Sequence, residues 1–220
     1  MTNPSTPESR ALVPLVIVGC GGFGREVHDV IDAVNSHSPT YDLLGYVDDN
    51  PASENLSRVH ARGSRVLGDL GWLANAAPRV QYLIGIGSPA VKAKIDARMG
   101  ERKTPKVVHP RATLGFDVRL SPGTVICAGS VLTTNITLGR HVHVNLLCSI
   151  GHDSTIGDHA SINPLVAVSG DVQVGARVML GTHSAILQGL TLGDDSVVGG
   201  AALVVKDVAA GSVVKGVPAR

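Results

Sequence analysis

The chain has 220 residues, of which 44% are apolar and only 3% aromatic, so its core must consist mainly of aliphatic side chains. A formal charge of +1 argues against a nucleic-acid partner, and no apolar run reaches the roughly 20 residues that span a bilayer. The polar beginning contains no signal-peptide core, so we expect a disordered tail over residues 1–11. Three dispersed cysteines provide neither a disulfide framework nor a metal-ligand spacing, which favours a cytoplasmic protein without a bound metal.

Residues 12–105 alternate patterns typical of strands and helices, which predicts a small Rossmann-like α/β domain with a parallel sheet, shorter than a full dinucleotide-binding domain. Asp69 and Ser88 are expected helix N-caps, and Pro89 occupies a first helical position. The polar segment 100–106 marks the predicted domain boundary. The expected strands are 12–18, 41–49 and 80–87, and the expected helices are 25–34, 69–77 and 88–99.

A glycine-rich loop, VGCGGFGREV, follows the first expected strand and opens the first expected helix, with the spacing G-x-G-x-x-G. Such a loop lets a phosphate approach backbone amides, and a carboxylate after the second strand can accept hydrogen bonds from a ribose or a base. A single nucleotide diphosphate fits this short domain better than NAD, and a glycine-rich turn without a ligand is the alternative. The predicted nucleotide-sugar-binding residues here are Gly19, Gly21, Gly22, Phe23, Gly24, Asp48, Asp49 and Gly87.

From Val108 onward the sequence follows a period of six residues. Every sixth position from Val108 to Val204, seventeen in all, is valine, isoleucine or leucine, and the residue two places earlier is usually small or β-branched. This period predicts an all-β solenoid over residues 106–205, in which three units close an 18-residue triangular coil, followed by a C-terminal extension over 206–220. A β-sandwich would need strands of varied length, which the unbroken period excludes.

A short α/β domain followed by a hexapeptide solenoid resembles the sialic acid O-acetyltransferase-like family, which includes nucleotide-sugar N-acetyltransferases. The resemblance covers nearly the whole chain after the tail and rests on IVGCGGFG, YVDDN, VNLLCSIGHDSTIGDHASI and GDDSVVGGAALVVKDVAAGSVVKGVPAR. It implies a left-handed parallel β-helix, a homotrimer with acetyl-CoA bound between neighbouring prisms, and a 4-amino sugar on UDP or GDP bound to the N-terminal domain. In this family the residue matching His152 is the catalytic base and the one matching Asp153 orients it, while Asn145 would accept a hydrogen bond from the sugar amine.

The repeat gives independent grounds for a base at His152. His152 and Asp153 fall on a corner of the coil, where side chains point out of the prism. A histidine can accept a proton from an amine near neutral pH, and a neighbouring carboxylate can fix its tautomer. A backbone N–H near Gly170, one coil further on, could donate to the oxyanion of the thioester. From the repeat alone, a solvated corner pair is equally acceptable.

Two residues depart from the family pattern. Phe23 replaces a histidine that often helps to hold the substrate, and Ser161 stands where another histidine is common, with His159 two residues earlier. These changes leave the reaction class intact and the identity of the sugar open.

Several residues along the solenoid are expected to face solvent or the cofactor. His141, His159 and Arg177 are 18 residues apart, which predicts an exposed polar column, with contact between His159 or Arg177 and CoA phosphates or the nucleotide as the alternative. The predicted acetyl-CoA-binding residues are His159, Gly170, Gly181, His183, Gly199, Lys206 and Lys215.

Three other functions compete with sugar N-acetylation. An O-acetyltransferase acting on a sialic-acid-like hydroxyl would use the same fold. A trimeric zinc carbonic anhydrase would need three or four converging ligands, and the repeat supplies only the close pair His141 and His143. A binding module without activity is disfavoured by the presence of His152 and Asp153.

Overall fold

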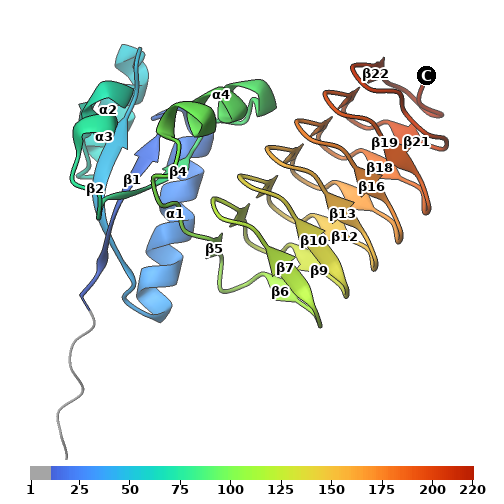
Figure 1. Ribbon diagram of the computed structural model, residues 1–220, viewed down its shortest axis with the longest axis horizontal. Helices are drawn as coiled ribbons and strands as arrows, with labels where there is room; N and C mark the ends of the chain where they lie inside the picture. The colour runs from blue at the N-terminus through green and yellow to red at the C-terminus, as the bar shows by residue number, and fades with distance from the viewer. Residues whose placement is uncertain (1–10) are drawn as a thin grey trace, which may run out of the picture.

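The computed structural model describes residues 11–220, so the tail expected over residues 1–11 lies almost wholly outside the described residues. The chain forms a small α/β domain and a long triangular prism that extends away from it (Figure 1). No helix within residues 11–220 is long and apolar enough to cross a membrane.

The α/β domain is a parallel sheet between two pairs of helices. Its strand order is β3-β2-β1-β4, so the chain reverses direction across the sheet between β1 and β4. Helices α1 and α2 share one apolar cluster with the sheet, and α3 and α4 share another. The strands are β1 (Val13–Val18), β2 (Tyr41–Val47), β3 (Val66–Gly68) and β4 (Gln81–Ile84), and the helices are α1 (Gly22–His37), α2 (Ser53–Ala61), α3 (Leu70–Asn75) and α4 (Pro89–Met99).

The expected caps are present in this domain. Asp69 accepts a hydrogen bond from the amide of Trp72, and Ser88 caps α4 with Pro89 in its first turn. Sequence analysis predicts neither α2 nor β3. Helix α2 buries only Val59, and β3 has three residues, so neither leaves a clear apolar pattern.

The prism is a left-handed parallel β-helix, as the resemblance implies. Its strands stack in three parallel sheets, and over residues 107–204 paired residues are 18 positions apart, as Ile150 is from Leu132 and Val168. The strands are β5 (Val107–Val108), β6 (Thr113–Leu114), β7 (Val118–Leu120), β8 (Val125–Ile126), β9 (Val131–Leu132), β10 (Ile136–Leu138), β11 (His143–Val144), β12 (Ser149–Ile150), β13 (Thr155–Ile156), β14 (Ser161–Ile162), β15 (Ala167–Val168), β16 (Gln173–Val174), β17 (Met179–Leu180), β18 (Ala185–Ile186), β19 (Thr191–Leu192), β20 (Val197–Val198), β21 (Leu203–Val204) and β22 (Val213–Val214).

The six-residue period forms the core of the prism. All of the repeat positions from Ile126 to Val204 are buried, and the small residues two places earlier fill the remaining space inside each coil. Non-glycine residues in the left-handed region, such as Asp153 with φ 61°, occupy corners between strands. This conformation costs about 1–2 kcal/mol, and a hydrogen bond from the Asp153 amide to the carbonyl of Thr134 in the preceding coil helps to offset it.

Residues 206–220, which the sequence predicts to be a C-terminal extension, add to the stack. Strand β22 pairs with β20 through Val197 and Val213, so this coil is 16 residues long instead of 18. Beyond β22 the chain turns back, and the amide of Ala219 donates to the carbonyl of Leu203 in β21.

Candidate functional site

The predicted base and its acid form a polar group on one corner of the prism. His152 Nδ1 lies 2.7 Å from Asp153 Oδ2, and Asp153 Oδ1 accepts a hydrogen bond of 3.1 Å from Asn135 Nδ2. The side chains of His152 and Asp153 are 62% and 53% exposed. The hydrogen bonds from His152 and Asn135 lower the pKa of Asp153, so its carboxylate stays ionised beside the imidazole.

This geometry leaves one ring nitrogen of His152 available to a substrate. Because Nδ1–H donates to the carboxylate, Nε2 carries the free lone pair. Gly170 lies one coil further along, as the 18-residue repeat predicts, and a Cβ placed on it would come within 2.5 Å of His152 Nε2. The imidazole therefore packs against a backbone that has no side chain. The proposed oxyanion contact of Gly170 remains a prediction.

A second cluster lies at the carboxyl edge of the α/β sheet. A cavity of about 420 Å³ is lined by Gly19, Asp48 and Asp49, together with Lys94 and Arg98 of α4. Asp48 Oδ2 accepts a hydrogen bond from the amide of Cys20, and Asp49 Oδ1 accepts one from the amide of Leu70. The cavity lies beside the reversal in strand order, where parallel α/β sheets bind their ligands.

The glycines of this edge serve two purposes. Gly19 has φ +96°, and a Cβ on Gly24 would lie 2.0 Å from the carbonyl oxygen of Gly19, so these two allow α1 to approach the strand ends. A Cβ on Gly21, Gly22 or Gly87 would meet nothing within 4 Å. The backbone at these three positions borders open space at the start of α1 and after β4, where an anionic group could approach it.

Between the two domains lies a smaller cavity of about 260 Å³, which several predicted substrate residues line. The ring of Phe23 lies 4.8 Å from that of His143, and Ser161 Oγ donates a hydrogen bond of 2.7 Å to the carbonyl of Gly87. Both departures from the family pattern, Phe23 and Ser161, thus lie where the domains meet. The lining residues are Phe23, Glu26, Gly87, His143, Asn145, Ser161, Ile162, Asn163 and Pro164.

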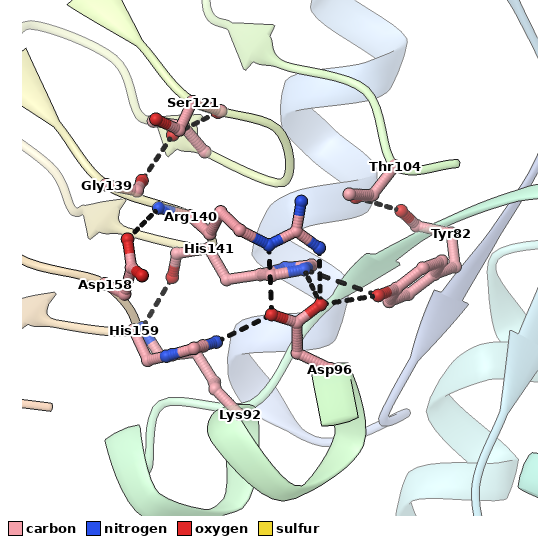
Figure 2. A network of polar contacts seen from close by, with 11 residues as sticks. Tyr82, Lys92, Asp96, Thr104, Ser121, Gly139, Arg140, His141, Asp158 and His159 are labelled. Atoms are coloured by element: carbon pink, nitrogen blue, oxygen red, sulfur yellow. Dashed lines mark hydrogen bonds and ion pairs between the residues drawn. The ribbon is translucent and has the colours of Figure 1, made fainter. Parts of the chain in front are cut away.

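The expected exposed column of His141, His159 and Arg177 is wrong for its first two members. The side chain of His141 is fully buried and that of His159 nearly so, because both donate to Asp96 of α4, which covers this corner of the prism (Figure 2). Arg177, one coil further, pairs with Asp195. The domain contact removes the histidines from solvent, which the repeat alone does not reveal.

The other residues predicted to bind acetyl-CoA lie along the prism on the C-terminal side of His152 and Asp153. His183, Lys206 and Lys215 are exposed. Gly181 and Gly199 have packing reasons to be glycine, since a Cβ on either would lie within about 3 Å of the next coil. Whether these residues contact acetyl-CoA stays a prediction.

Residues 11–220 contain no group of three or more histidine, cysteine or acidic side chains placed to hold a metal ion. His143 is buried without a hydrogen-bond partner for either ring nitrogen, and His141 Nε2 is occupied by Asp96. The pair considered for zinc therefore lacks a third ligand.

Sequence reasoning missed four residues that help to shape these sites. Asn135 is 18 residues before Asp153, so the repeat spacing could have identified it. Lys94, Arg98 and Asp96 are ordinary charged helix residues in the sequence, and only the fold places them beside the cavity and the domain contact.

Comparison with known proteins agrees with this architecture. Residues 14–99 match the family described as the PglD N-terminal domain. The structure of PerB from Caulobacter crescentus in complex with CoA and GDP-perosamine is 26% identical, with a TM-score of 0.85 over 96% of this chain and 98% of that one. WeeI from Acinetobacter baumannii AYE is 25% identical, with a TM-score of 0.80 over 94% and 98%. The acetyltransferase domain of PglB from Neisseria gonorrhoeae FA1090, 24% identical with a TM-score of 0.84 over 94% and 98%, shares the fold.

Proposed function

Because residues 14–99 form a PglD-type N-terminal domain and the chain as a whole resembles hexapeptide-repeat sugar acetyltransferases, we propose that this protein transfers an acetyl group from acetyl-CoA to the amino group of a nucleotide-linked amino sugar. A 4-amino-6-deoxy sugar is the acceptor class that we propose. The observation that carries the proposal is the corner dyad, in which Asp153 orients His152 and leaves Nε2 free.

In the proposed reaction His152 acts as general base. Its Nε2 accepts a proton from the sugar amine, whose nitrogen attacks the thioester carbonyl of acetyl-CoA. The tetrahedral intermediate collapses as the C–S bond breaks, and the thiol leaves with the proton that His152 returns. Asp153 holds the imidazole in the tautomer that this cycle needs and stabilises the imidazolium formed within it.

The substrates are proposed to occupy different parts of the molecule. The nucleotide would bind the cavity at the carboxyl edge of the sheet, beside Gly21 and Gly22 and within reach of Asp48 and Asp49. The sugar would extend toward Asn145 in the cavity between the domains. Acetyl-CoA would lie along the prism, where Gly181, Gly199, His183, Lys206, Lys215 and Gly170 are the proposed contacts. His159 is left out of this set because its side chain is held by Asp96 beneath α4.

We also propose that the active protein is a homotrimer with its sites between subunits. Three leucines, Leu146, Leu147 and Leu165, are exposed near a corner of the prism that the α/β domain does not cover, and closed cyclic assembly would bury them. The described cysteines, Cys20, Cys127 and Cys148, are all free and buried, which fits a reducing, cytoplasmic setting and a role in glycan biosynthesis there.

The proposal is tested by incubating the purified protein with acetyl-CoA and a panel of UDP-, GDP- and dTDP-linked amino sugars, followed by mass spectrometry. We expect a gain of one acetyl group on an amine, and a fall of about 10²–10⁴-fold in kcat for His152→Ala. Acetylation of a sialic-acid-like hydroxyl instead would establish the O-acetyltransferase alternative. Near-normal turnover by folded His152→Ala at saturating acceptor would rule out His152 as the base.

A further inference from the structure

Helix α4 connects the two domains because its opposite sides contact different parts of the molecule. Val91, Lys94, Ile95 and Arg98 line the cavity at the carboxyl edge of the sheet. Lys92 and Asp96, one turn apart, instead contact the prism. Any shift of α4 on the prism would therefore move a wall of the nucleotide cavity.

Asp96 receives hydrogen bonds from both domains (Figure 2). Its Oδ1 accepts from Arg140 Nη2 at 2.6 Å and from His141 Nε2 and Tyr82 Oη at 3.1 Å each. Its Oδ2 accepts from His159 Nε2 at 2.9 Å and from Arg140 Nε at 3.2 Å. The carboxylate is only 11% exposed, so these five bonds replace nearly all of its hydration.

Two further groups of the α/β domain, the Lys92 ammonium and the Gly87 carbonyl, form hydrogen bonds to the prism near Asp96. Lys92 is fully buried, and its Nζ donates hydrogen bonds of 3.0 Å to the carbonyl of His141 and 2.9 Å to the carbonyl of Ala160. These two carbonyls belong to successive coils of the prism. Next to α4, the carbonyl of Gly87 accepts from Ser161 of the prism. Directional bonds to fixed backbone atoms permit few alternative placements of α4, unlike apolar packing alone.

We propose that Asp96 is a positioning residue: by holding α4 against Arg140, His141 and His159, it sets where the nucleotide-binding domain presents the acceptor amine relative to His152. The inference rests on the proposed function. An acceptor anchored through its nucleotide depends on this placement, whereas an amino sugar without a nucleotide does not. Loss of Asp96 should therefore impair the two acceptors differently.

The test compares Asp96→Asn with wild type on a nucleotide-linked amino sugar and on the same amino sugar without its nucleotide. The asparagine side chain has the size of the aspartate side chain, but it has only one acceptor oxygen and no negative charge. Its NH₂ group would face donors that now bond to the second carboxylate oxygen. We expect kcat for the nucleotide-linked acceptor to fall at least tenfold, since displacements of about 1 Å can cost 10²-fold. The KM for acetyl-CoA and kcat/KM for the unlinked sugar should stay within twofold.

A second readout does not depend on turnover. Hydrogen exchange in Asp96→Asn should become faster in α4 and at residues 85–88 and stay unchanged at residues 170–204. Asp32→Asn is the matched control, because it removes a carboxylate paired with Arg62 inside the α/β domain alone, and it should leave kinetics and exchange unchanged. If Asp96→Asn does not fold, Arg140→Gln serves instead, because it removes two of the five hydrogen bonds from a partly exposed position. It should lower kcat for the nucleotide-linked acceptor at least threefold, with the same selectivity for that acceptor and the same faster exchange in α4.

Equal losses for both acceptors, or unchanged kcat and exchange in a folded variant, would overturn the positioning role. Absence of transfer by wild type to every nucleotide-linked amino sugar would instead refute the proposed function. The exchange measurement then still decides whether Asp96 fixes α4 on the prism.

Discussion

The 18-residue spacing of the prism builds the dyad from three successive coils. Asn135 lies one coil before Asp153 and donates to its carboxylate, while Gly170 lies one coil after His152 and borders its ring. The imidazole is thus oriented from one side by a hydrogen bond and confined on the other by backbone. A glycine at position 170 keeps the space that the ring occupies.

Gly170→Ala is expected to displace the imidazole. The added Cβ would lie 2.5 Å from His152 Nε2 and within 2.9 Å of two ring carbons, closer than such contacts allow. Because a small misplacement of a catalytic group is costly, we expect a fall of about 10²-fold in kcat with an unchanged fold by circular dichroism. Gly170 does not have a positive φ, so alanine at this position adds the contact with the ring without left-handed backbone strain. Unchanged turnover by Gly170→Ala would show that the ring has room to move.

The buried histidines where the α/β domain covers the prism make the stability of the protein depend on pH. Burial lowers the pKa of His141 to about 4, although the negative charge of Asp96 acts to raise it. Burial also lowers the pKa of His143 far below its ordinary value. Around them, Arg140, Lys92 and His159 disfavour further positive charge. Although burial opposes its ionisation, hydrogen bonds from Arg140 and His159 hold the pKa of Asp96 well below the ordinary range, so Asp96 stays charged.

Stability is therefore expected to fall on acidification from pH 6.5 toward 4. Both folded-state pKa values lie below the unfolded value near 6.5, so the unfolded chain binds more protons in this window and the free energy of unfolding declines as pH falls. Each histidine contributes up to about 1.4 kcal/mol per pH unit. Urea denaturation at pH 7.5 and 5.0 measures the change at fixed protein concentration.

The variants separate this effect from general acid sensitivity. His143→Leu should reduce the loss between pH 7.5 and 5.0, whereas His60→Gln, on the exposed surface of α2, should leave the loss as in wild type. A loss of equal size in all three proteins would assign the acid sensitivity to other groups.

The elements also show what sequence could and could not predict. The six-residue period places the core and the corners of the prism, because each position repeats one environment, and the caps at Asp69 and Ser88 follow from local chemistry. The burial of His141 has no such local signal. It depends on α4 folding over that corner, a contact between residues 45 positions apart. Helix α2 and strand β3 are missed for another reason, because each buries too little apolar surface to leave a pattern in the sequence.

The exposed leucines at one corner of the prism, Leu146, Leu147 and Leu165, predict that the protein assembles into a trimer. Leu147 is 61% exposed beside Leu146, and the two line a cavity of about 440 Å³ with Arg111, Ala128 and Gly129. We expect light scattering to give three times the chain mass of 22.7 kDa. Leu147→Glu should shift the protein toward monomer and lower activity, because a charge cannot be buried there without a partner.

Leu12→Glu is the matched control, since it places the same charge at an exposed apolar position of the α/β domain. It should remain a trimer. A wild-type monomer at micromolar concentration would contradict active sites shared between subunits.

The turn-back of the chain over β21 limits how far the prism can extend. An open stack of parallel strands ends in unpaired donors and acceptors, on which another chain could add like the next layer of a fibril. Here Leu203 donates to the carbonyl of Gly216 and accepts from the amide of Ala219, while Lys215 and Arg220 bond each other. The edge of β21 is thus occupied by the same chain that built it. This closure leaves one fewer open strand edge at the C-terminal end of the prism for another chain to extend.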